Sequence, residues 1–297
     1  MKTSLDCIPC FARQALEAAR FATDDPAIHE RIVRHVLRAA ADMDLGQCPP
    51  VVGQKIHRTL REITRVDDPY RDVKDRFNRM ALDMLPELAM KVRQAADPLA
   101  MALRLAIAGN VIDFGVNGSV TEDDVRQAVA HALNEPLHGD VDAFREAIGE
   151  AQDILYLTDN AGEIVFDRLL IERLPIERVT AVVRGGAIIN DATMADAEAV
   201  GLCELVKLID NGSDAPGTIL SDCSEDFRQR FVEADLIIAK GQGNFESLSD
   251  EAADIFFLFK VKCPVIAAHV ALQVGTHILI RSRAGSLVAG GEAHAGI

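Results

Sequence analysis

The first candidate for chemistry is a short polar segment that directly follows an aliphatic run. Residues 158–163 read Thr-Asp-Asn-Ala-Gly-Glu, so Asp159 and Asn160 place two oxygen-donating side chains next to each other. Such oxygens bind hard divalent cations, and the amide groups of a following helix can hold a phosphate. The alternative is an ordinary helix cap, with Asn160 as the N-cap residue and Glu163 as its capping-box partner.

A second polar segment, residues 184–193, follows the next aliphatic run and reads Arg-Gly-Gly-Ala-Ile-Ile-Asn-Asp-Ala-Thr. Arg184 would lie at the tip of a strand, and Asp191 would add an oxygen ligand to those of the first segment. Two carboxylates and one amide leave positions open for water and substrate, as magnesium and manganese sites usually do. Helix capping is again the alternative, since Thr193 and Asp196 resemble a capping box.

The third segment, residues 240–246, reads Lys-Gly-Gln-Gly-Asn-Phe-Glu. A dinucleotide fingerprint would need a third glycine where Glu246 stands, which disfavours a nicotinamide or flavin cofactor. Lys240 would lie at a strand tip, and the glycines after it leave backbone groups accessible beside Asn244. This arrangement is suited to holding a phosphoryl oxygen. The alternative is a surface lysine in a tight turn.

Two further pairs of side chains are weaker candidates. Asn110 and Asp113 stand in a glycine-containing stretch, residues 106–118, which would either reach the same pocket or form an Asx-type turn. Cys7 and Cys10 have the spacing of a metal or redox pair. Because no second pair of this kind follows, a structural or shielding role is the other interpretation.

The elements that must position these residues change in kind near residue 150. From residue 5 to about 147, apolar residues recur every three to four positions with breaks at prolines, which predicts four or five helices. From residue 153, short β-branched runs alternate with helical segments, which predicts a parallel sheet with helices on both faces. We expect strands at residues 154–157, 179–183, 205–209, 236–239, 256–259 and 265–267.

The predicted fold is therefore α/β, a three-layer α/β/α domain with a parallel sheet, preceded by a smaller all-helical domain. We expect the helical domain at residues 1–105 and the α/β/α domain at residues 106–297. In such sheets ligands bind beyond the carboxyl ends of the strands, which is where the three polar segments fall.

The composition restricts the partners of this protein. The chain has 297 residues with 31 Lys and Arg against 46 Asp and Glu, and the formal net charge of −15 opposes binding to nucleic acid. The N-terminus lacks the apolar run of a secretory signal, and no unbroken apolar stretch suits a membrane span, so we expect a cytoplasmic location. Six cysteines in a reducing compartment predict free thiols. The oligomeric state is left open.

The three segments, in this order and spacing behind an N-terminal Asp-Cys-Ile-Pro-Cys run, resemble the damage-control phosphatase family and its prokaryotic Cys-x-x-Cys branch. The resemblance covers nearly the whole chain. It implies a helical part packed on an α/β/α domain, and metal-dependent hydrolysis of phosphorylated metabolites, often damaged ones. It also implies metal ligands at Asp159, Asn160 and Asp191, and substrate contacts at Lys240, Asn244 and Arg184.

The expected chemistry follows from the demands of phosphate ester hydrolysis. The cation would join its ligands to one phosphoryl oxygen, while Lys240 and the amides near Gly162 hold the others. The nucleophile is either a metal-bound water or the Asp159 carboxylate itself. Glu163 or Asp196 would orient the water or take its proton.

Magnesium or manganese is the expected metal, and cobalt or nickel would also suit these ligands. The substrate would be a small phosphorylated metabolite, such as a sugar phosphate or a nucleotide. Two alternatives stay open. One is an S-adenosylmethionine-dependent carboxyl methyltransferase, although its usual glycine-rich loop after the first strand is missing. The other is a protein that binds phosphorylated metabolites without turning them over.

Overall fold

Helices fill the first half of the chain, as predicted, but its described residues form seven helices where four or five were expected. The computed structural model describes residues 1–109, 121–283 and 286–288. The helices of this half are α1 (Cys7–Ala22), α2 (Pro26–Ala41), α3 (Pro49–Thr64), α4 (Arg71–Gln94), α5 (Pro98–Gly109), α6 (Glu122–Asn134) and α7 (Val141–Glu150). Three of them begin at a proline, because its fixed φ suits the first helical turn and its missing N–H costs nothing there.

The second half is built around one sheet, and the α/β class is confirmed. Its strands are β1 (Leu137–Gly139), β2 (Ile154–Leu157), β3 (Val179–Val183), β4 (Lys207–Asp210), β5 (Leu236–Lys240), β6 (Ile255–Lys260), β7 (His277–Arg283) and β8 (Ser286–Val288). They lie in the order β1-β7-β6-β5-β2-β3-β4, with β8 paired to β7. All neighbouring strands are parallel except in two pairs: β7 is parallel to β1 but antiparallel to β6 and to β8.

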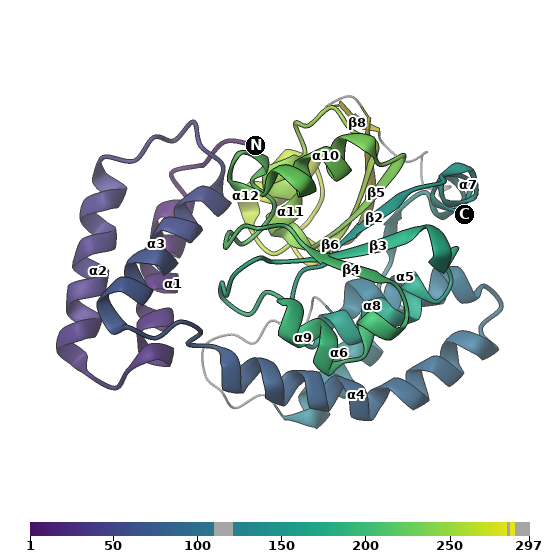
Figure 1. Cartoon of the computed structure of the whole chain (residues 1–297), viewed down its shortest axis with the longest axis horizontal. Helices are drawn as coiled ribbons and strands as arrows, with labels where there is room; N and C mark the ends of the chain where they lie inside the picture. The colour runs from purple at the N-terminus through teal and green to yellow at the C-terminus, as the bar shows by residue number, and fades with distance from the viewer. Residues whose placement is uncertain (110–120, 284–285, 289–297) are drawn as a thin grey trace.

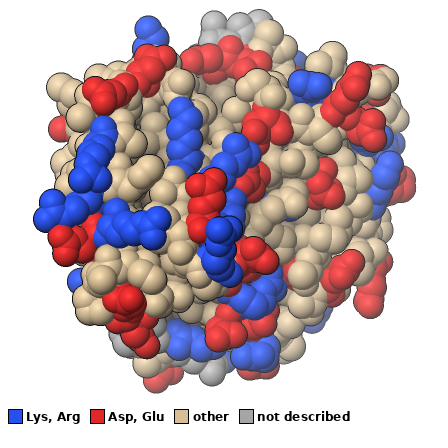
Figure 2. All heavy atoms as spheres, turned by 60° about the vertical axis from the view of Figure 1, so that its left-hand side comes forward, with Lys and Arg blue, Asp and Glu red and all other residues tan. Residues whose placement is uncertain are grey.

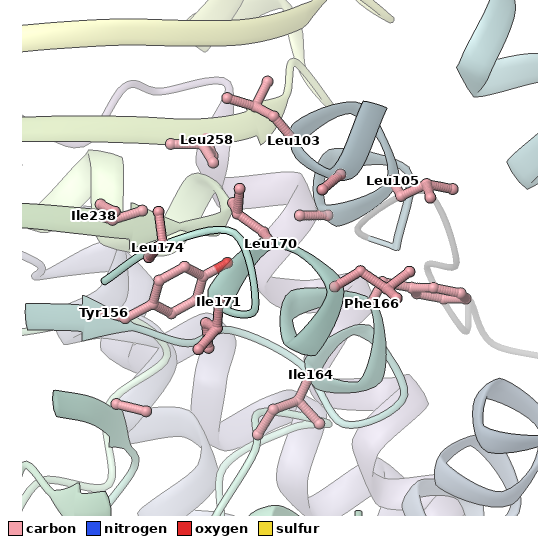
Figure 3. Packing of buried hydrophobic residues seen from close by; sticks show 14 of the residues in the cluster. Leu103, Leu105, Tyr156, Ile164, Phe166, Leu170, Ile171, Leu174, Ile238 and Leu258 are labelled. Atoms are coloured by element: carbon pink, nitrogen blue, oxygen red, sulfur yellow. The ribbon is translucent and has the colours of Figure 1, made fainter. Parts of the chain in front are cut away.

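Helices cover both faces of the sheet, which gives the predicted three layers (Figure 1). Along β2 the side chains alternate: Ile154 and Tyr156 belong to one buried cluster, and Leu155 and Leu157 belong to another. The first cluster includes side chains of α4, α5 and α8 (Glu163–Ile171), and Figure 3 shows its packing around Tyr156. The second cluster is covered by α10 (Glu225–Glu233), α11 (Gly241–Leu248) and α12 (Pro264–Val270).

One predicted strand is wrong. Residues 265–267 lie in α12, because Pro264 occupies the first turn of a helix, and a three-residue apolar run is too short for periodicity to separate the two states. The prediction also missed β7, the strand that follows α12 and gives the sheet its antiparallel part.

Helices α1, α2 and α3 form a unit with its own core, to the left of the sheet in Figure 1. This core contains Phe11, Ile32, Leu60 and Tyr70. Helices α4 and α5 instead contribute to the core beneath the sheet, and the predicted domain boundary at residue 105 falls inside α5. The division into two domains at that residue stays a prediction.

Helix α3 joins this unit to the α/β part through the loop that follows β4. Gln54 Nε2 donates to Asp214 Oδ1 at 2.7 Å and to Asp222 Oδ2 at 2.6 Å. Arg58 Nη2 pairs with Asp214 Oδ1 at 2.6 Å. Since this loop follows the carboxyl end of a strand, the helical unit lies beside the edge of the sheet where ligands are expected.

Charged side chains of both signs share the surface. On the face that Figure 2 shows, Lys and Arg side chains stand among Asp and Glu side chains. No helix in the described part of the chain is long and apolar enough to cross a membrane.

Candidate metal and phosphate site

The strand order brings the three polar segments together at one edge of the sheet. From β2 the chain winds outward through β3 to β4, and it then returns to β5, which pairs with the other side of β2. The carboxyl ends of β5, β2 and β3 are therefore neighbours at a point where the winding direction reverses. Ligands of open α/β sheets bind at such points.

Backbone hydrogen bonds join the segments after β2 and β3 and place the three predicted metal ligands at one location. Asn160 and Asp191 form an isolated antiparallel bridge, and Ala192 N donates to Asp159 O at 2.7 Å. The N-cap residue of α8 is Gly162, and it makes no side-chain cap. The interpretation of Asn160 as an N-cap residue is therefore wrong.

The side-chain amide of Asn160 is oriented by two carboxylates. Its Nδ2 donates to Asp159 Oδ2 at 2.8 Å and to Glu163 Oε2 at 3.0 Å. Both N–H groups of the amide are then engaged, so the atom left to face an electropositive ligand is Oδ1. Glu163 thereby acts on the candidate ligand Asn160 and not on a free water.

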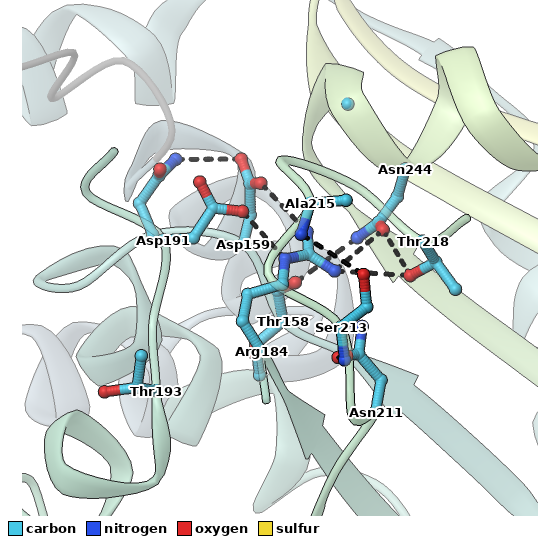
Figure 4. Close-up of polar contacts among 12 residues, drawn as sticks. Thr158, Asp159, Arg184, Asp191, Thr193, Asn211, Ser213, Ala215, Thr218 and Asn244 are labelled. Atoms are coloured by element: carbon cyan, nitrogen blue, oxygen red, sulfur yellow. Dashed lines mark hydrogen bonds and ion pairs between the residues drawn. The ribbon is translucent and has the colours of Figure 1, made fainter. Parts of the chain in front are cut away.

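The guanidinium of Arg184 faces both Asp159 and Asp191 (Figure 4). Its Nε donates to Asp191 Oδ2 at 2.7 Å, and its Nη1 donates to Thr218 Oγ1 at 3.2 Å and to Asn244 Oδ1 at 3.3 Å. The Nη2 atom lies 3.7 Å from Asp159 Oδ1 and has no hydrogen-bond partner among the described residues, although Arg184 is only 3% exposed. A buried unsatisfied donor next to two candidate metal ligands is suited to an oxygen of a bound phosphate.

Asn244 supports this arginine. Its Oδ1 also accepts from Thr218 Oγ1 at 2.8 Å, and its Nδ2 donates to Lys240 O at 2.7 Å and to Thr158 O at 3.2 Å. Because these bonds engage both ends of its amide, we correct the expected substrate contact of Asn244 to a positioning role for Arg184. Sequence reasoning missed Thr218, which stands in the loop after β4 without any motif.

The electrostatics of the site favour a bound cation. Burial raises the pKa of Asp159 well above its usual range, and Glu163 and Asp191 raise it further, against the opposing effect of Arg184. Burial also raises the pKa of Asp191, although Arg184 opposes this too. One guanidinium thus serves two buried carboxylates that repel each other, and a divalent cation would offset the remaining negative charge.

Lys240 does not point into this site. It is fully buried, and its Nζ donates to Glu163 Oε1 at 2.6 Å, to Asp167 Oδ1 at 2.6 Å and to Ala106 O at 2.8 Å. Burial opposes its charge, but Asp167 and Glu163 outweigh burial and raise its pKa. Since all three N–H donors are used, both the predicted contact with a phosphoryl oxygen and the surface-turn alternative are wrong.

Lys240 and Glu163 instead form a buried chain of contacts that ends at Asn160. Lys240 holds one oxygen of Glu163, and the other oxygen of Glu163 accepts from the Asn160 amide. On its far side, Lys240 is held by Asp167, whose Oδ1 also accepts from Tyr156 OH at 2.8 Å. Burial raises the pKa of Asp167 to about 6, although Lys240 lowers it.

The backbone amides near Gly162 are also not free to hold phosphate. Gly162 N donates to Asn78 Oδ1 at 2.7 Å, and Ala161 N donates to Asn190 O at 2.9 Å. The predicted phosphate contact at these amides is therefore wrong, because an α4 side chain and the neighbouring segment occupy the donors. No signal in the sequence singles out Asn78, which stands 84 residues before its partner.

Asp196 belongs to a helix cap. It forms a capping box with Thr193 at the start of α9 (Met194–Ala199), and its Oδ2 lies 2.8 Å from the buried Lys74 Nζ. The capping interpretation of this pair is confirmed. The proposed action of Asp196 on a water is corrected, because a capping box and a buried ion pair engage its oxygens.

The weaker candidates have different outcomes. Asn110 and Asp113 lie outside the described residues. Cys7 and Cys10 are free thiols. Within the described ranges no three His, Cys, Asp or Glu side chains gather closely enough to hold a metal, so these cysteines form no such group. Their shielding or redox role stays a prediction.

Comparison with known proteins places this arrangement in a family. The family model described as the damage-control phosphatase ARMT1-like domain matches residues 3–278. A damage-control phosphatase of Pyrococcus horikoshii is 35% identical, with 95% of this chain and 99% of that protein covered. A damage-control phosphatase of Archaeoglobus fulgidus is 36% identical, with 93% of this chain and 97% of that protein covered.

An uncharacterised protein of Methanocaldococcus jannaschii is 36% identical, with 95% of this chain and 96% of that protein covered. The crystal structure of a DUF89 family protein from Pyrococcus horikoshii superposes with a TM-score of 0.84 at 34% identity and covers 95% of this chain and all of that one. These likenesses extend over nearly the full length of the sequence and of the fold. The chain therefore belongs to the damage-control phosphatase ARMT1-like family.

Proposed function

We propose that this protein is a divalent-metal-dependent phosphatase that hydrolyses a small phosphate monoester. The observation that carries the proposal is the buried group at the reversal point of the sheet, where two carboxylates and one amide oxygen stand beside the unsatisfied Nη2 of Arg184. The names of the relatives from Pyrococcus and Archaeoglobus support a phosphatase.

The donor set fits a hard divalent ion. Asp159 and Asp191 offer carboxylate oxygens, and Asn160 offers an amide oxygen that its hydrogen bonds leave free. Magnesium or manganese is the proposed metal, and cobalt or nickel would fit the same oxygens. When bound, the ion would neutralise phosphoryl charge and make a nearby water more acidic.

The residues of the chain itself divide the work. Arg184 would donate its Nη2 hydrogens to a phosphoryl oxygen. Negative charge that develops on this oxygen in the transition state is stabilised most effectively by a donor that is already oriented before the reaction. Lys240 and Glu163 would hold the Asn160 amide in its orientation and keep water out of the sheet interior. Glu163 is thus a positioning residue in this proposal.

The attacking group is either a water molecule or Asp159. A carboxylate that attacks phosphorus forms an acyl phosphate, which water then hydrolyses, and Asp159 is buried beside the phosphate donor Arg184 as such a step requires. The stereochemical course at a chiral phosphorus distinguishes the two routes. Retention of configuration indicates two displacements, the first by the Asp159 carboxylate and the second by water, and inversion indicates a single displacement by water.

The experiment that tests the function is phosphate release from an aryl phosphate and a panel of sugar phosphates and nucleotides, with and without added divalent metal. Wild type is compared with Asp159→Ala and with Asp226→Ala, an exposed acidic residue of α10. We expect metal-dependent release that is lost in Asp159→Ala and kept in Asp226→Ala. Absence of release with every metal, together with binding of S-adenosylmethionine, would favour the methyltransferase instead.

A further inference from the structure

A cavity of about 640 Å³ opens beside the proposed metal site. Its walls come from the α1–α3 unit on one side and from α11 and α12 on the other, and they include the aromatic side chains Phe11, Phe21 and Tyr70. The candidate metal ligands do not line it. Its lining includes Asn190, the chain neighbour of Asp191, and Gly243, near the start of α11. Its volume is that of a site for a small metabolite.

The charged side chains in the cavity wall are mostly acidic. They are Asp6, Glu17 and Glu246, against a single basic side chain, Arg13. Arg13 is 72% exposed at its side chain, and its Nε lies 3.7 Å from Glu17 Oε1. Among the described residues of the wall, the one cation is therefore already associated with one of the acids and largely in solvent.

Glu246 is a half-buried acid of this wall. It stands on α11, where its Oε1 accepts from Gln242 Nε2 at 2.8 Å, and no donor among the described residues engages its Oε2. The N-terminal amine bonds the backbone oxygen of Glu246 at 2.9 Å and pairs with Asp250 at 3.1 Å. Burial raises the pKa of Glu246 to about 7, and Gln242 and the amine only partly oppose this. The carboxyl group therefore has no close cationic side chain in the part of the chain that the structure describes.

We propose that this cavity receives the leaving group of the substrate, and that Glu246 selects phosphate monoesters whose leaving group offers an N–H or O–H donor and carries no second anionic group. This inference rests on the proposed phosphatase function and adds its substrate class. A donor would satisfy the free oxygen of Glu246. A carboxylate or second phosphate would face Glu246, Glu17 and Asp6 without a free cation to accept it.

Matched pairs of monophosphates test the selection. Glycerol 3-phosphate is compared with 3-phosphoglycerate, and sorbitol 6-phosphate with 6-phosphogluconate, because the members of each pair differ only by a hydroxymethyl group in place of a carboxylate. At about pH 8, above the raised pKa of Glu246, this carboxyl group is ionised. There we expect kcat/KM of wild type to be at least about tenfold higher for the member of each pair without the carboxylate, as like charges in a partly buried site repel. In Glu246→Gln we expect the ratio to fall to about threefold or less.

The control variant is Glu177→Gln, which removes the same charge at the opposite edge of the sheet, just before β3. It should keep the wild-type ratio. Equal turnover of both members by wild type would overturn this inference while leaving the phosphatase intact, and so would a ratio unchanged in Glu246→Gln. No phosphate release from any compound would overturn the phosphatase function itself. The ratio of kcat/KM values measured for wild type tests the selection against a second anionic group even if Glu246→Gln does not fold.

Discussion

Gly241 lies against the carboxylate of Asp159. A Cβ at position 241 would stand 2.0 Å from Asp159 Oδ2, and Gly241 has a φ of +78°. The first residue after β5 therefore limits where the side chain after β2 can lie. A residue other than glycine would have both a strained backbone and a steric clash with a candidate metal ligand.

Gly241→Ala should reduce activity much more than stability. We expect kcat/KM to fall by about 100-fold, because a displaced carboxylate loses its alignment with the reacting group. The free energy of unfolding should fall by about 1–3 kcal/mol from the strained backbone. Gly149→Ala is the control, because a Cβ there meets no atom within 4 Å. If Gly241→Ala keeps wild-type kcat/KM, the Asp159 carboxylate is not a participant.

Arg184→Lys tests whether the guanidinium stabilises the transition state. Lysine keeps the charge but cannot bond Asp191 while it also directs a second donor toward the phosphate. We expect kcat to fall by about 100-fold with a smaller change in KM. Arg178→Lys, at the other edge of the sheet, is the matched control. A change in KM alone would mean that Arg184 contributes only to binding of the ground state.

Lys240→Met separates a supporting role from a direct contact with phosphate. Removing the ammonium leaves Glu163 and Asp167 buried without their cation, so the free energy of unfolding in urea should fall by about 3–5 kcal/mol. Adding Asp167→Asn should recover part of this loss, since it removes one of the two orphaned charges. A stable Lys240→Met variant with weakened inhibition by inorganic phosphate would instead indicate direct contact.

His57 should make stability depend on pH. Burial lowers the pKa of this α3 side chain from its usual 6.5 to about 3, and Arg61 contributes to the lowering. As the pH falls below 6.5 the unfolded chain binds a proton that the folded chain refuses. The contribution of His57 is thus complete above pH 6.5 and is lost as the pH falls toward 3.

The variant His57→Gln should therefore be affected less by acid than the wild type. Between pH 6.5 and pH 5 its free energy of unfolding should fall by about 2 kcal/mol less than that of wild type. Urea denaturation at both pH values measures the difference, and His35→Gln, an exposed position on α2, is the control. Equal losses in His57→Gln and wild type would mean that the folded protein protonates His57 readily.

The local sequence was sufficient to predict much of the fold. Prolines at the starts of α2, α3 and α5 were recognised as breaks between helices, because proline acts through its own φ and its missing N–H. The buried strands β2 and β3 match the predicted ranges, since consecutive β-branched and aliphatic residues identify a strand covered on both faces. The α12 error arose where three apolar residues carried too little periodicity.

The grouping of Asp159, Asn160 and Asp191 was also within reach of the sequence. Each residue stands in a polar segment that follows a predicted strand. The carboxyl ends of parallel strands lie at the same edge of a sheet, so these segments were expected to meet. Residue type and distance from the strand end were therefore enough to predict the neighbourhood of the site. The family resemblance pointed to the same residues.

Only the tertiary structure decided what each side chain does there. Lys240 lies at the carboxyl end of its strand, as the last residue of β5, yet its ammonium turns into the sheet interior because Glu163 and Asp167 neutralise it there. Asn78 takes the Gly162 amide that the sequence assigned to phosphate. Pattern and spacing determine which segments meet, because they act through short-range backbone preferences. The direction of a charged side chain depends on burial and on partners far away in the sequence, and these exist only once the chain has packed.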